Sequence, residues 1–447
     1  MVTVTMLRCF ILWMAALAVA TAADSPPVLS SLAELAQAAT RSGQKLKMKP
    51  GKYRLTDFIP LASIPERRKQ KQWQFITFSG NDNTFDLQGV TLELDTALRQ
   101  KLGSPIHTDE FLISGKGNTL QGLTITSLGK GIAFGGAVLG VTGQGNTLKD
   151  CVIHVEGSSP YGYGDLFGKG GHKHSGVHIT GSRSRFIDCK VFQKAFGHAF
   201  YLQENCDDVV FENCHAEGVM RRTDEMLAEI SGLAFDRRFM GEVQNRSGTT
   251  RIQPGYMKAL SEDGFRTYHT HRGLVLKNCT SKNMRGGFEL RTKTAPKLEN
   301  CTAIGCERGF WVSTGAVLTG CKGDTQFGPL LYVEGDKAKV EVQLLPTEAD
   351  KVNVHAVAAL YGIDNEVTIT AKSVRVQLSP ILIGYTPPAM GENATAHGER
   401  LARGLILRNQ TTMPVVIGTK AEKCQISTLG AVQENKGKDI TVTTHSR

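Results

Sequence analysis

The chain has 447 residues, which is enough length for one large solenoid or two ordinary domains. Its formal net charge is +10. Beyond the N-terminal segment no stretch approaches about twenty consecutive apolar residues, so no membrane span is predicted. The excess of Lys and Arg favours an anionic partner. For an exported protein the candidates are acidic polysaccharides, cell-wall polymers and lipid head groups, and nucleic acid is less favoured.

Residues 1–23 are predicted to be a signal peptide. Arg8 lies ahead of the apolar run 10–20, and Ala20 and Ala22 supply the small residues of a cleavage site. We therefore predict that the protein is secreted or periplasmic.

Six short phrases in the middle of the chain end in a cysteine. They are LKDC at Cys151, FIDC at Cys189, FENC at Cys214, LKNC at Cys279, LENC at Cys301 and LTGC at Cys321. Similar phrases at intervals near about twenty residues are typical of a solenoid, in which each repeat is one coil stacked on its neighbours. Because the six cysteines occupy one slot of successive coils, we predict a ladder of buried thiols rather than disulfides.

A strand that begins at a glycine precedes these phrases. The five copies begin at Gly176, Gly197, Gly264, Gly287 and Gly309. Alternation with a period of two residues predicts which side chains point into the coil. The predicted inward residues that follow each glycine are Val177, His198, Phe265, Phe288 and Phe310. His198 is thus predicted to be a core histidine.

These coils, with short strands and Asn-rich turns, resemble the right-handed parallel β-helix of the pectin-lyase-like superfamily. Residues 31–43 form a predicted amphipathic helix before the first coil, which is similar to the capping helix of such solenoids. The resemblance implies an all-β fold with a capped β-helix over 24–335, long loop insertions at 157–175 and 217–263, and last irregular coils with a C-terminal cap over 336–447. It predicts no particular activity, because this scaffold carries lyases, hydrolases, epimerases and binding proteins.

The remaining side chains of the glycine-led strands are predicted to form two outward columns. The first column is His178, Ala199, Arg266, Glu289 and Trp311, and the second is Thr180, Tyr201, Tyr268, Arg291 and Ser313. Aromatic faces suit sugar rings, and Arg suits carboxylate or sulfate through paired donors. The two insertions open at the same turn of their coils and should rise as walls along one edge of this face.

This composition favours a lyase that cleaves a uronic-acid polymer by β-elimination. Such a reaction needs a cation on the carboxylate, a base for the C5 proton and an acid for the leaving oxygen. The predicted base is Lys258 or a histidine of the HKH segment, above all His174; Arg266 and Arg291 would hold the carboxylate, and Tyr201 or Tyr268 would be the acid. Further substrate contacts are predicted for His172, Lys169, His178, Glu289, Arg291, Trp311 and Arg222.

Three alternatives remain open at this point. A glycoside hydrolase would need two carboxyl groups, for which Glu289 together with Asp263, Glu262 or Asp224 is available. A C5-epimerase shares the abstraction of the C5 proton, and a non-catalytic glycan-binding solenoid would need only the outward columns. No cofactor is predicted: calcium is used by some members of this superfamily, but the sequence has no compact acidic cluster that requires it. A monomer is expected.

Overall fold

The computed structural model describes residues 26–133, 135–166, 172–232, 235, 243–245, 248–250, 254–291, 295–346, 354–372, 379–387 and 398–445. The predicted signal peptide at 1–23 lies outside these residues, and so does Lys169. Within these ranges, none of the helices has the length and apolar character needed to cross a membrane.

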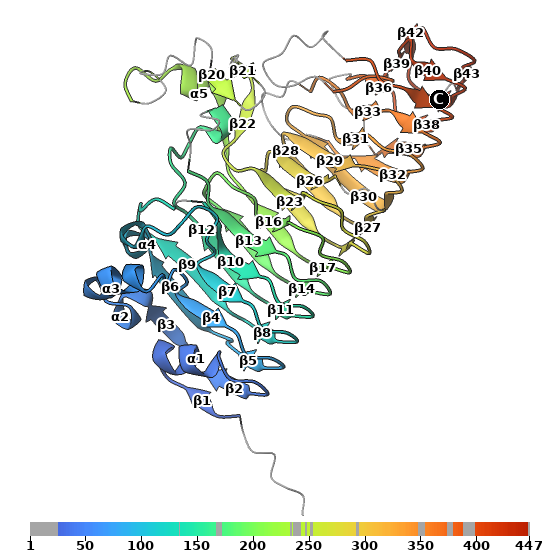
Figure 1. Ribbon diagram of the computed structural model, residues 1–447. Coiled ribbons are helices and arrows are strands. Elements are labelled where there is room, and N and C mark those ends of the chain that lie inside the picture. Colours follow the sequence, from blue (N-terminus) through green and yellow to red (C-terminus); the bar gives the residue numbers. More distant parts are fainter. Residues whose placement is uncertain are drawn as a thin grey trace, which may run out of the picture.

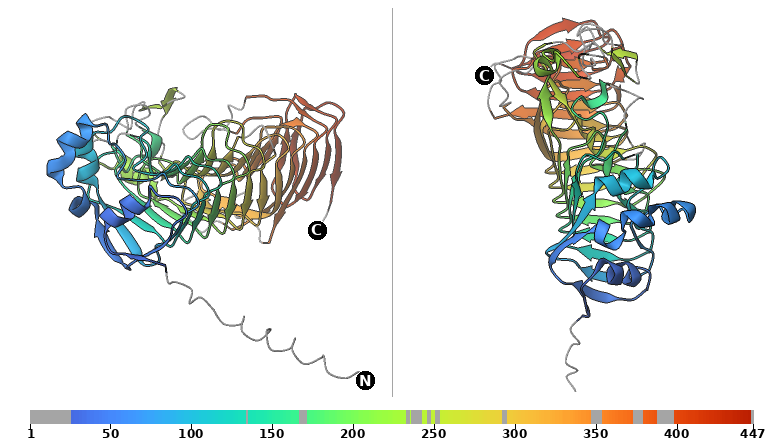
Figure 2. Two further views of the ribbon diagram at one scale, coloured as in Figure 1. Left: turned by 60° about the horizontal axis from the view of Figure 1, so that its bottom comes forward. Right: turned by 90° about the vertical axis from the view of Figure 1, so that its left-hand side faces the viewer.

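The chain winds into a parallel β-helix whose coils stack along one axis (Figures 1 and 2). One side of the stack is a thirteen-stranded sheet in which neighbouring strands run parallel. Its strands, in order, are β4 (Ile76–Phe78), β7 (Phe111–Ile113), β10 (Ala137–Val141), β13 (Ser175–Ile179), β16 (Phe200–Leu202), β23 (Asp263–Thr267), β26 (Gly286–Leu290), β29 (Arg308–Val312), β31 (Leu331–Val333), β33 (Ala358–Leu360), β36 (Ile381–Ile383), β39 (Val415–Ile417) and β42 (Val432–Asn435).

The other sides of the coil are two runs of parallel strands that form one sheet. The first run is β1 (Val28–Leu29), β2 (Lys45–Met48), β5 (Thr84–Asp86), β8 (Thr119–Gln121), β11 (Thr147–Lys149), β14 (Arg185–Ile187), β17 (Val210–Glu212), β24 (Val275–Lys277) and β27 (Lys297–Glu299). The second run is β3 (Gly51–Arg54), β6 (Val90–Asp95), β9 (Thr124–Leu128), β12 (Val152–Val155), β15 (Lys190–Gln193), β18 (His215–Glu217), β25 (Thr280–Lys282) and β28 (Thr302–Cys306). Both runs join at β30 (Val317–Thr325), which pairs with β27 and β28.

Parallel pairing continues beyond residue 335. After β30 it passes through β32 (Lys339–Leu344), β35 (Glu366–Ala371), β38 (Ile406–Gln410), β41 (Gln425–Thr428) and β43 (Thr441–Thr444). A small parallel sheet of β34 (Gly362–Ile363), β37 (Ala402–Arg403) and β40 (Ala421–Glu422) accompanies these coils. The residues expected to form irregular last coils therefore extend the same stack of strands.

The repeated cysteine phrase corresponds to a tight bend between two strands of one coil. The Asp, Asn or Gly before each ladder cysteine has a positive φ, from 52° at Asn278 to 63° at Gly320. Asp, Asn and Gly enter this left-handed region at the lowest cost, which explains their place in the phrase. The following thiol faces the preceding coil, as where Cys189 Sγ lies 3.4 Å from the Leu148 carbonyl oxygen. All nine cysteines in the described ranges are buried and free, so the predicted thiol ladder is confirmed.

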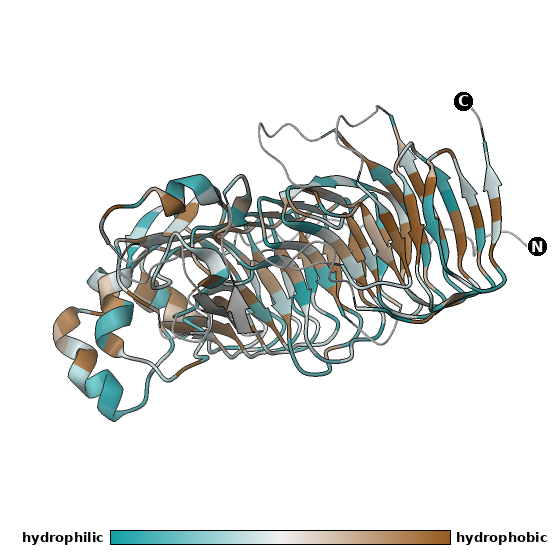
Figure 3. Ribbon diagram, turned by 90° about the horizontal axis from the view of Figure 1, so that it is seen from above, coloured by the Kyte–Doolittle hydropathy of each residue, from teal (hydrophilic) through white to brown (hydrophobic). Residues whose placement is uncertain are grey.

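Stacked aromatic rings fill the centre of the solenoid. Phe200, Phe265, Phe288 and Phe310 stack with 5.0–5.2 Å between ring centroids, one ring for each coil. Along the strands, hydrophobic residues alternate with hydrophilic ones (Figure 3), as expected when one face of a strand lies in the core.

Short helices gather near the N-terminal end of the stack (Figures 1 and 2). The predicted N-terminal helix is shorter than expected, and its buried residues join the solenoid core. The helices are α1 (Leu32–Ala38), α2 (Leu55–Phe58), η1 (Leu61–Ser63), α3 (Ile64–Lys69), α4 (Thr96–Leu102) and, in the second insertion, α5 (Thr223–Leu227). A capping role for α1 stays a prediction.

Candidate active site

The candidate site lies on the outer face of the thirteen-stranded sheet, where β16, β23, β26 and β29 are neighbours. Strand pairing places His178, Tyr201, Arg266, Glu289 and Trp311 in one row across successive coils. Tyr201 therefore stands in the first outward column. The glycine alignment had predicted the second column, so this prediction is wrong. One side of the solenoid carries the four residues that were expected to lie together, namely Arg266, Tyr268, Tyr201 and Arg291.

Each strand of the sheet has a position directly before its first inward residue, and we call this position the glycine slot. The residue that fills this slot explains why the register of β16 differs from the predicted one. A Cβ atom on Gly264 or Gly287 would come within 2.9 Å of a carbonyl oxygen in the next coil, so these positions need a very small residue. Pairing of Val177 with Phe200 and of Phe200 with Phe265 puts Ala199, not Gly197, in this slot. The strand that follows is displaced by two residues from the predicted alignment.

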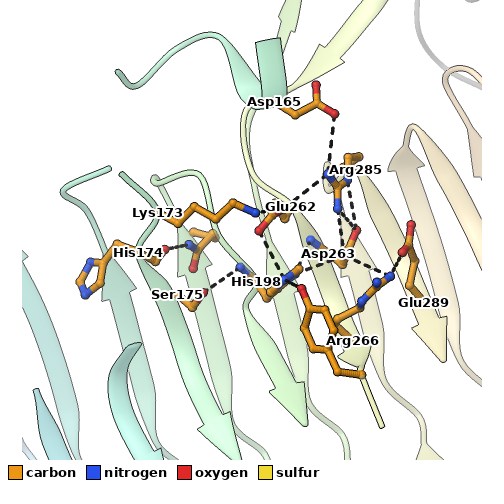
Figure 4. A network of polar contacts seen from close by, with 12 residues as sticks. Asp165, Lys173, His174, Ser175, His198, Glu262, Asp263, Arg266, Arg285 and Glu289 are labelled. Carbon is orange, nitrogen blue, oxygen red and sulfur yellow. Dashed lines mark hydrogen bonds and ion pairs between the residues drawn. The ribbon is translucent and has the colours of Figure 1, made fainter. Parts of the chain in front are cut away.

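His198 is consequently not a core histidine, and the prediction that it faces the coil interior is wrong. His198 lies before β16 begins at Phe200, so the alternation of a strand does not assign its direction. Its imidazole is buried in a polar network (Figure 4). Nε2 lies 2.7 Å from Tyr268 Oη, and Nδ1 lies 3.2 Å from Asp263 Oδ2. Glu262 Oε2 also lies 3.3 Å from Nε2, so each ring nitrogen is next to a carboxylate. In the tautomer with N–H at Nδ1, that N–H faces the Asp263 carboxylate and Nε2 can accept the Tyr268 hydroxyl. The three groups form one hydrogen-bonded chain.

Cations surround the two carboxylates beside His198. Arg285 contacts Asp263 Oδ2 at 3.2 Å and Glu262 Oε1 at 3.4 Å, and Lys173 Nζ lies 2.5 Å from Glu262 Oε1. Burial alone would raise the pKa of both carboxyl groups, but Arg285 and His198 hold the pKa of Asp263 well below its usual value, and His198, Arg285 and Lys173 lower that of Glu262. Both acids are therefore ionised at neutral pH.

Glu289 is the centre of a second group of charges on the same face. Its buried carboxylate is in ion-pair contact with Arg266, with Arg291 at 3.3 Å and with Arg308 at 2.5 Å. The Arg266 guanidinium also lies 4.7 Å from the centroid of the Tyr268 ring, which joins this group to the His198 chain.

Lys258, the predicted base, is held by two carboxylates. Its Nζ lies 2.7 Å from Asp165 Oδ1 and 3.1 Å from Glu307 Oε1. Burial would lower the pKa of this ammonium, but Asp165 and Glu307 outweigh burial and raise it. A permanently charged lysine has no lone pair for a proton, so the geometry does not suit Lys258 as a base.

Lys258 also joins the two insertions, which contact each other instead of standing apart. It lies on β22 (Met257–Ala259), which pairs with β19 (Met220–Arg222) in the second insertion, whereas Asp165 belongs to the first. A small apolar cluster of Leu166, Met226 and Leu260 packs between them. The described parts of the insertions form one wall beside the site. The short hairpin of β20 (Val243–Asn245) and β21 (Gly248–Thr250) also belongs to the second insertion.

Replacing Lys258 by methionine should destabilise the protein by about 3–5 kcal/mol, because two buried carboxylates lose their shared cation. Lys282→Met is the matched control. Lys282 is 42% exposed and pairs with Glu217 at 2.9 Å, so its loss should cost about 1 kcal/mol or less. Denaturant midpoints of both variants measure the difference, and equal costs would show that Lys258 is not a buried partner of these acids.

His174, the other predicted base, lies outside the His198 network. Its imidazole points away from Glu262 (Figure 4) and is buried with Arg99 and Glu110. Nε2 lies 3.3 Å from Glu110 Oε1, and Arg99 Nη1 lies 2.8 Å from the same oxygen. Burial raises the pKa of Glu110, but Arg99 and His174 overcome this and lower it. His174 thus serves a buried ionic cluster that ties α4 to the first insertion.

His178 and Tyr201 form a ring stack next to the network. Their centroids are 4.8 Å apart with an interplanar angle of 12°, and the Tyr201 ring lies 5.5 Å from that of His198. His178 Nδ1 is 2.8 Å from Asp109 Oδ2. Burial and the nearby carboxylate of Asp109 raise the pKa of Tyr201, so its hydroxyl stays protonated.

The other predicted contacts are scattered over the insertions. His172 is exposed and forms an isolated bridge with Ser159, and half-buried Arg222 ends β19. In contrast, Arg285, Arg308 and Glu307 are part of the network but were not predicted. They share one signal: each stands one or two residues before a glycine-slot residue, at the first residue of its strand or directly before it.

No cluster of three or more His, Cys, Asp or Glu side chains that could hold a metal ion occurs in the part of the chain that the structure describes. The carboxylates of the site are instead in contact with Arg and Lys side chains. His174 precedes β13 and His178 lies on it, and each contacts a different carboxylate, so the two imidazoles do not share one ligand.

No protein-family model and no curated protein sequence matches the chain. Several solved structures are similar in shape. A mannuronic acid specific polysaccharide family 6 lyase from human gut microbiota has a TM-score of 0.45 at 8% identity, over 93% of this chain and 82% of that one. The alginate lyase AlyF-OU02 in complex with G6 has a TM-score of 0.46 at 12% identity, over 91% and 86%. Endo-xylogalacturonan hydrolase from Aspergillus tubingensis has 0.37 at 10% identity, over 93% of each chain. The fold of this protein rests on its own strand pairing, and its chemistry on the residues described above.

Proposed function

We propose that the protein is a polysaccharide lyase that cleaves a uronic-acid-containing chain by β-elimination. The observation that carries the proposal is the hydrogen-bonded triad of Tyr268, His198 and Asp263, which lies among guanidinium groups on the outer face of the solenoid. A half-buried phenol backed by a histidine and a carboxylate can move a proton in both directions, and guanidinium groups suit an anionic sugar.

Tyr268 is the group proposed to touch the reacting sugar. Burial and the Glu262 carboxylate raise its pKa, although Arg266 opposes this, so the phenol is protonated at neutral pH. As Tyr268 Oη takes the C5 proton, its own proton passes to His198 Nε2, and Asp263 and Glu262 stabilise the imidazolium that forms. The bond from C4 to the glycosidic oxygen then breaks with formation of the C4–C5 double bond. The leaving oxygen takes a proton from Tyr268, and His198 returns its proton to the phenolate.

Arg266 is proposed to bind the carboxylate of the reacting sugar. Its guanidinium lies over the Tyr268 ring, and its Nε is buried without a hydrogen-bond partner among the described residues. A cation at that carboxylate stabilises the negative charge that develops when the C5 proton leaves.

The carboxyl groups of the network favour elimination over hydrolysis. A hydrolase needs one carboxylic acid that stays protonated, which requires a raised pKa. The pKa values of Glu262, Asp263 and Asp165 are all lowered, because cations next to them outweigh the effect of burial. These acids are better suited to stabilising an imidazolium than to donating a proton. A secreted or periplasmic location, as predicted from residues 1–23, fits a polymeric substrate.

Incubation of the protein with a panel of polyuronates tests the proposal. A lyase produces an unsaturated uronate at each new non-reducing end, so ultraviolet absorbance should rise together with the number of reducing ends. New reducing ends without that absorbance would identify a hydrolase. Incorporation of deuterium from heavy water without cleavage would identify an epimerase, and binding alone would identify a glycan-binding protein.

A further inference from the structure

The ion-pair group at Glu289 has more cations than anions. Three guanidinium groups, from Arg266, Arg291 and Arg308, contact this single carboxylate. A second carboxylate, Asp263, lies 3.8 Å from Arg266, but it is shared with Arg285 and His198. The side chains of Arg291 and Arg308 are 35% and 27% exposed, and that of Arg266 is 10% exposed. Positive charge that is partly withdrawn from water is costly without an anion, so another negative group would be stabilised here.

Two donors of this group point to where that anion would bind. Nε of Arg291 and Nε1 of Trp311 are buried atoms without a hydrogen-bond acceptor among the described residues. Their side chains are stacked, with the guanidinium carbon of Arg291 3.4 Å from the centroid of the Trp311 ring. Burial, together with the charges of Arg266 and Arg308, lowers the pKa of Arg291 to about 10, although Asp263 and Glu334 oppose this shift. Leaving a buried donor unpaired costs about 1–3 kcal/mol, and an incoming oxyanion would remove this cost.

We propose that Arg291, Trp311 and Arg308 form a subsite for an oxyanion substituent, a carboxylate or a sulfate ester, on the sugar next to the reacting one. The position relative to the reacting sugar rests on the function proposed above. Tyr268 follows β23, Arg291 follows β26 and Trp311 lies on β29, so the subsite is one to two coils along the solenoid from the phenol. Adjacent strands are about 4.8 Å apart, which places the two anions on neighbouring sugars of a chain that runs along the stack. The substrate would then carry negative charge on consecutive units.

Binding to the Tyr268→Phe variant tests the subsite without turnover. Affinity for a polyuronate, for a sulfated polysaccharide that lacks uronate and for a neutral glucan is compared by calorimetry. Arg291→Gln in this background should weaken binding of one or both polyanions by about 10- to 100-fold, the value of one lost hydrogen bond to a charged group, and should leave the neutral glucan unchanged. The polyanion that is affected identifies the carboxylate or the sulfate as the ligand.

Two further variants separate the subsite from general effects. Arg403→Gln removes an exposed charge that pairs with Glu422, and it should change affinity by less than about twofold. Trp311→Phe keeps an aromatic ring against Arg291 but removes the indole N–H, and it should weaken polyanion binding even if Arg291→Gln fails to fold. Equal losses in Arg291→Gln and Arg403→Gln, or full affinity in both Arg291→Gln and Trp311→Phe, would overturn the subsite. If these variants behave as expected but the native protein forms no unsaturated product from any polyuronate, the subsite stands and the lyase proposal fails.

Discussion

Tyr268→Phe should lower kcat for elimination by about a thousandfold, within the range of about 10²–10⁴ that a positioned proton-transfer group contributes. The variant loses only the hydroxyl group that hydrogen-bonds to His198 Nε2. The ring remains under Arg266 and beside the His198 imidazole, where the centroids are 5.6 Å apart. Substrate affinity should therefore change little, and initial rates of unsaturated product measured over a range of substrate concentrations separate kcat from KM.

Tyr256→Phe is the matched control for this variant. Tyr256 Oη also hydrogen-bonds to a histidine, at 2.9 Å from His355 Nε2, but this pair lies outside the His198 network. Its loss should leave kcat within about a factor of two, since removing a hydrogen bond away from the reacting atoms has no direct effect on proton transfer. Full activity of Tyr268→Phe, or an equal loss in both variants, would remove Tyr268 from the mechanism.

Acid should destabilise the protein strongly, and Asp263 should account for a large part of this effect. The pKa values of Asp263 and Glu262 are lowered in the folded state from ordinary values of 3.8 and 4.5. A lowered pKa means that the ionised group stabilises the fold fully above its unfolded pKa and loses this contribution as the pH falls through its folded pKa. The free energy of unfolding should therefore decrease as the pH falls below about 4.5.

Asp263→Asn isolates this contribution. At neutral pH the variant should be less stable by about 3–5 kcal/mol, because Arg285 and Arg266 lose a buried counter-charge. Its further loss of stability in acid should be smaller than that of the native protein, because one proton-binding group is absent. Denaturant midpoints measured from neutral pH down to about pH 3 test both expectations.

Asp86→Asn provides the comparison, since Asp86 forms an exposed ion pair with Lys47 at 3.3 Å. This variant should lose about 1 kcal/mol or less and keep the native pH dependence. Native-like stability of Asp263→Asn at neutral pH, together with an unchanged acid slope, would contradict an ionised and paired Asp263.

The repeat made the architecture predictable because backbone geometry and local residue choice agree. Asn300 and its counterparts adopt the left-handed bend, and the cysteine after each bend packs inside, so the phrase marks the coils in the sequence itself. Strand alternation also placed Arg266 and Glu289 correctly, since both stand in the middle of regular strands.

The parts of the site that sequence reasoning missed lie where such local rules end. Ala199 fills a slot that Gly fills elsewhere, so the register of His198 could not be read from the glycines. Arg285 and Arg308 precede their glycine-slot residues and lie where their strands begin. At these positions the two-residue alternation does not predict which way a side chain points. His174 was placed wrongly because its partners, Arg99 and Glu110, come from distant coils that local sequence does not reveal.

The buried thiol ladder gives this protein a set of internal reporters of opening. Cysteines from Cys151 to Cys424 are spread over most of the stack, and each is at most 3% exposed. A thiol-reactive reagent can reach such a group only when its own layer separates from the next one. The order in which the cysteines become modified under mild denaturing conditions would therefore map where the solenoid first comes apart, without any engineered label.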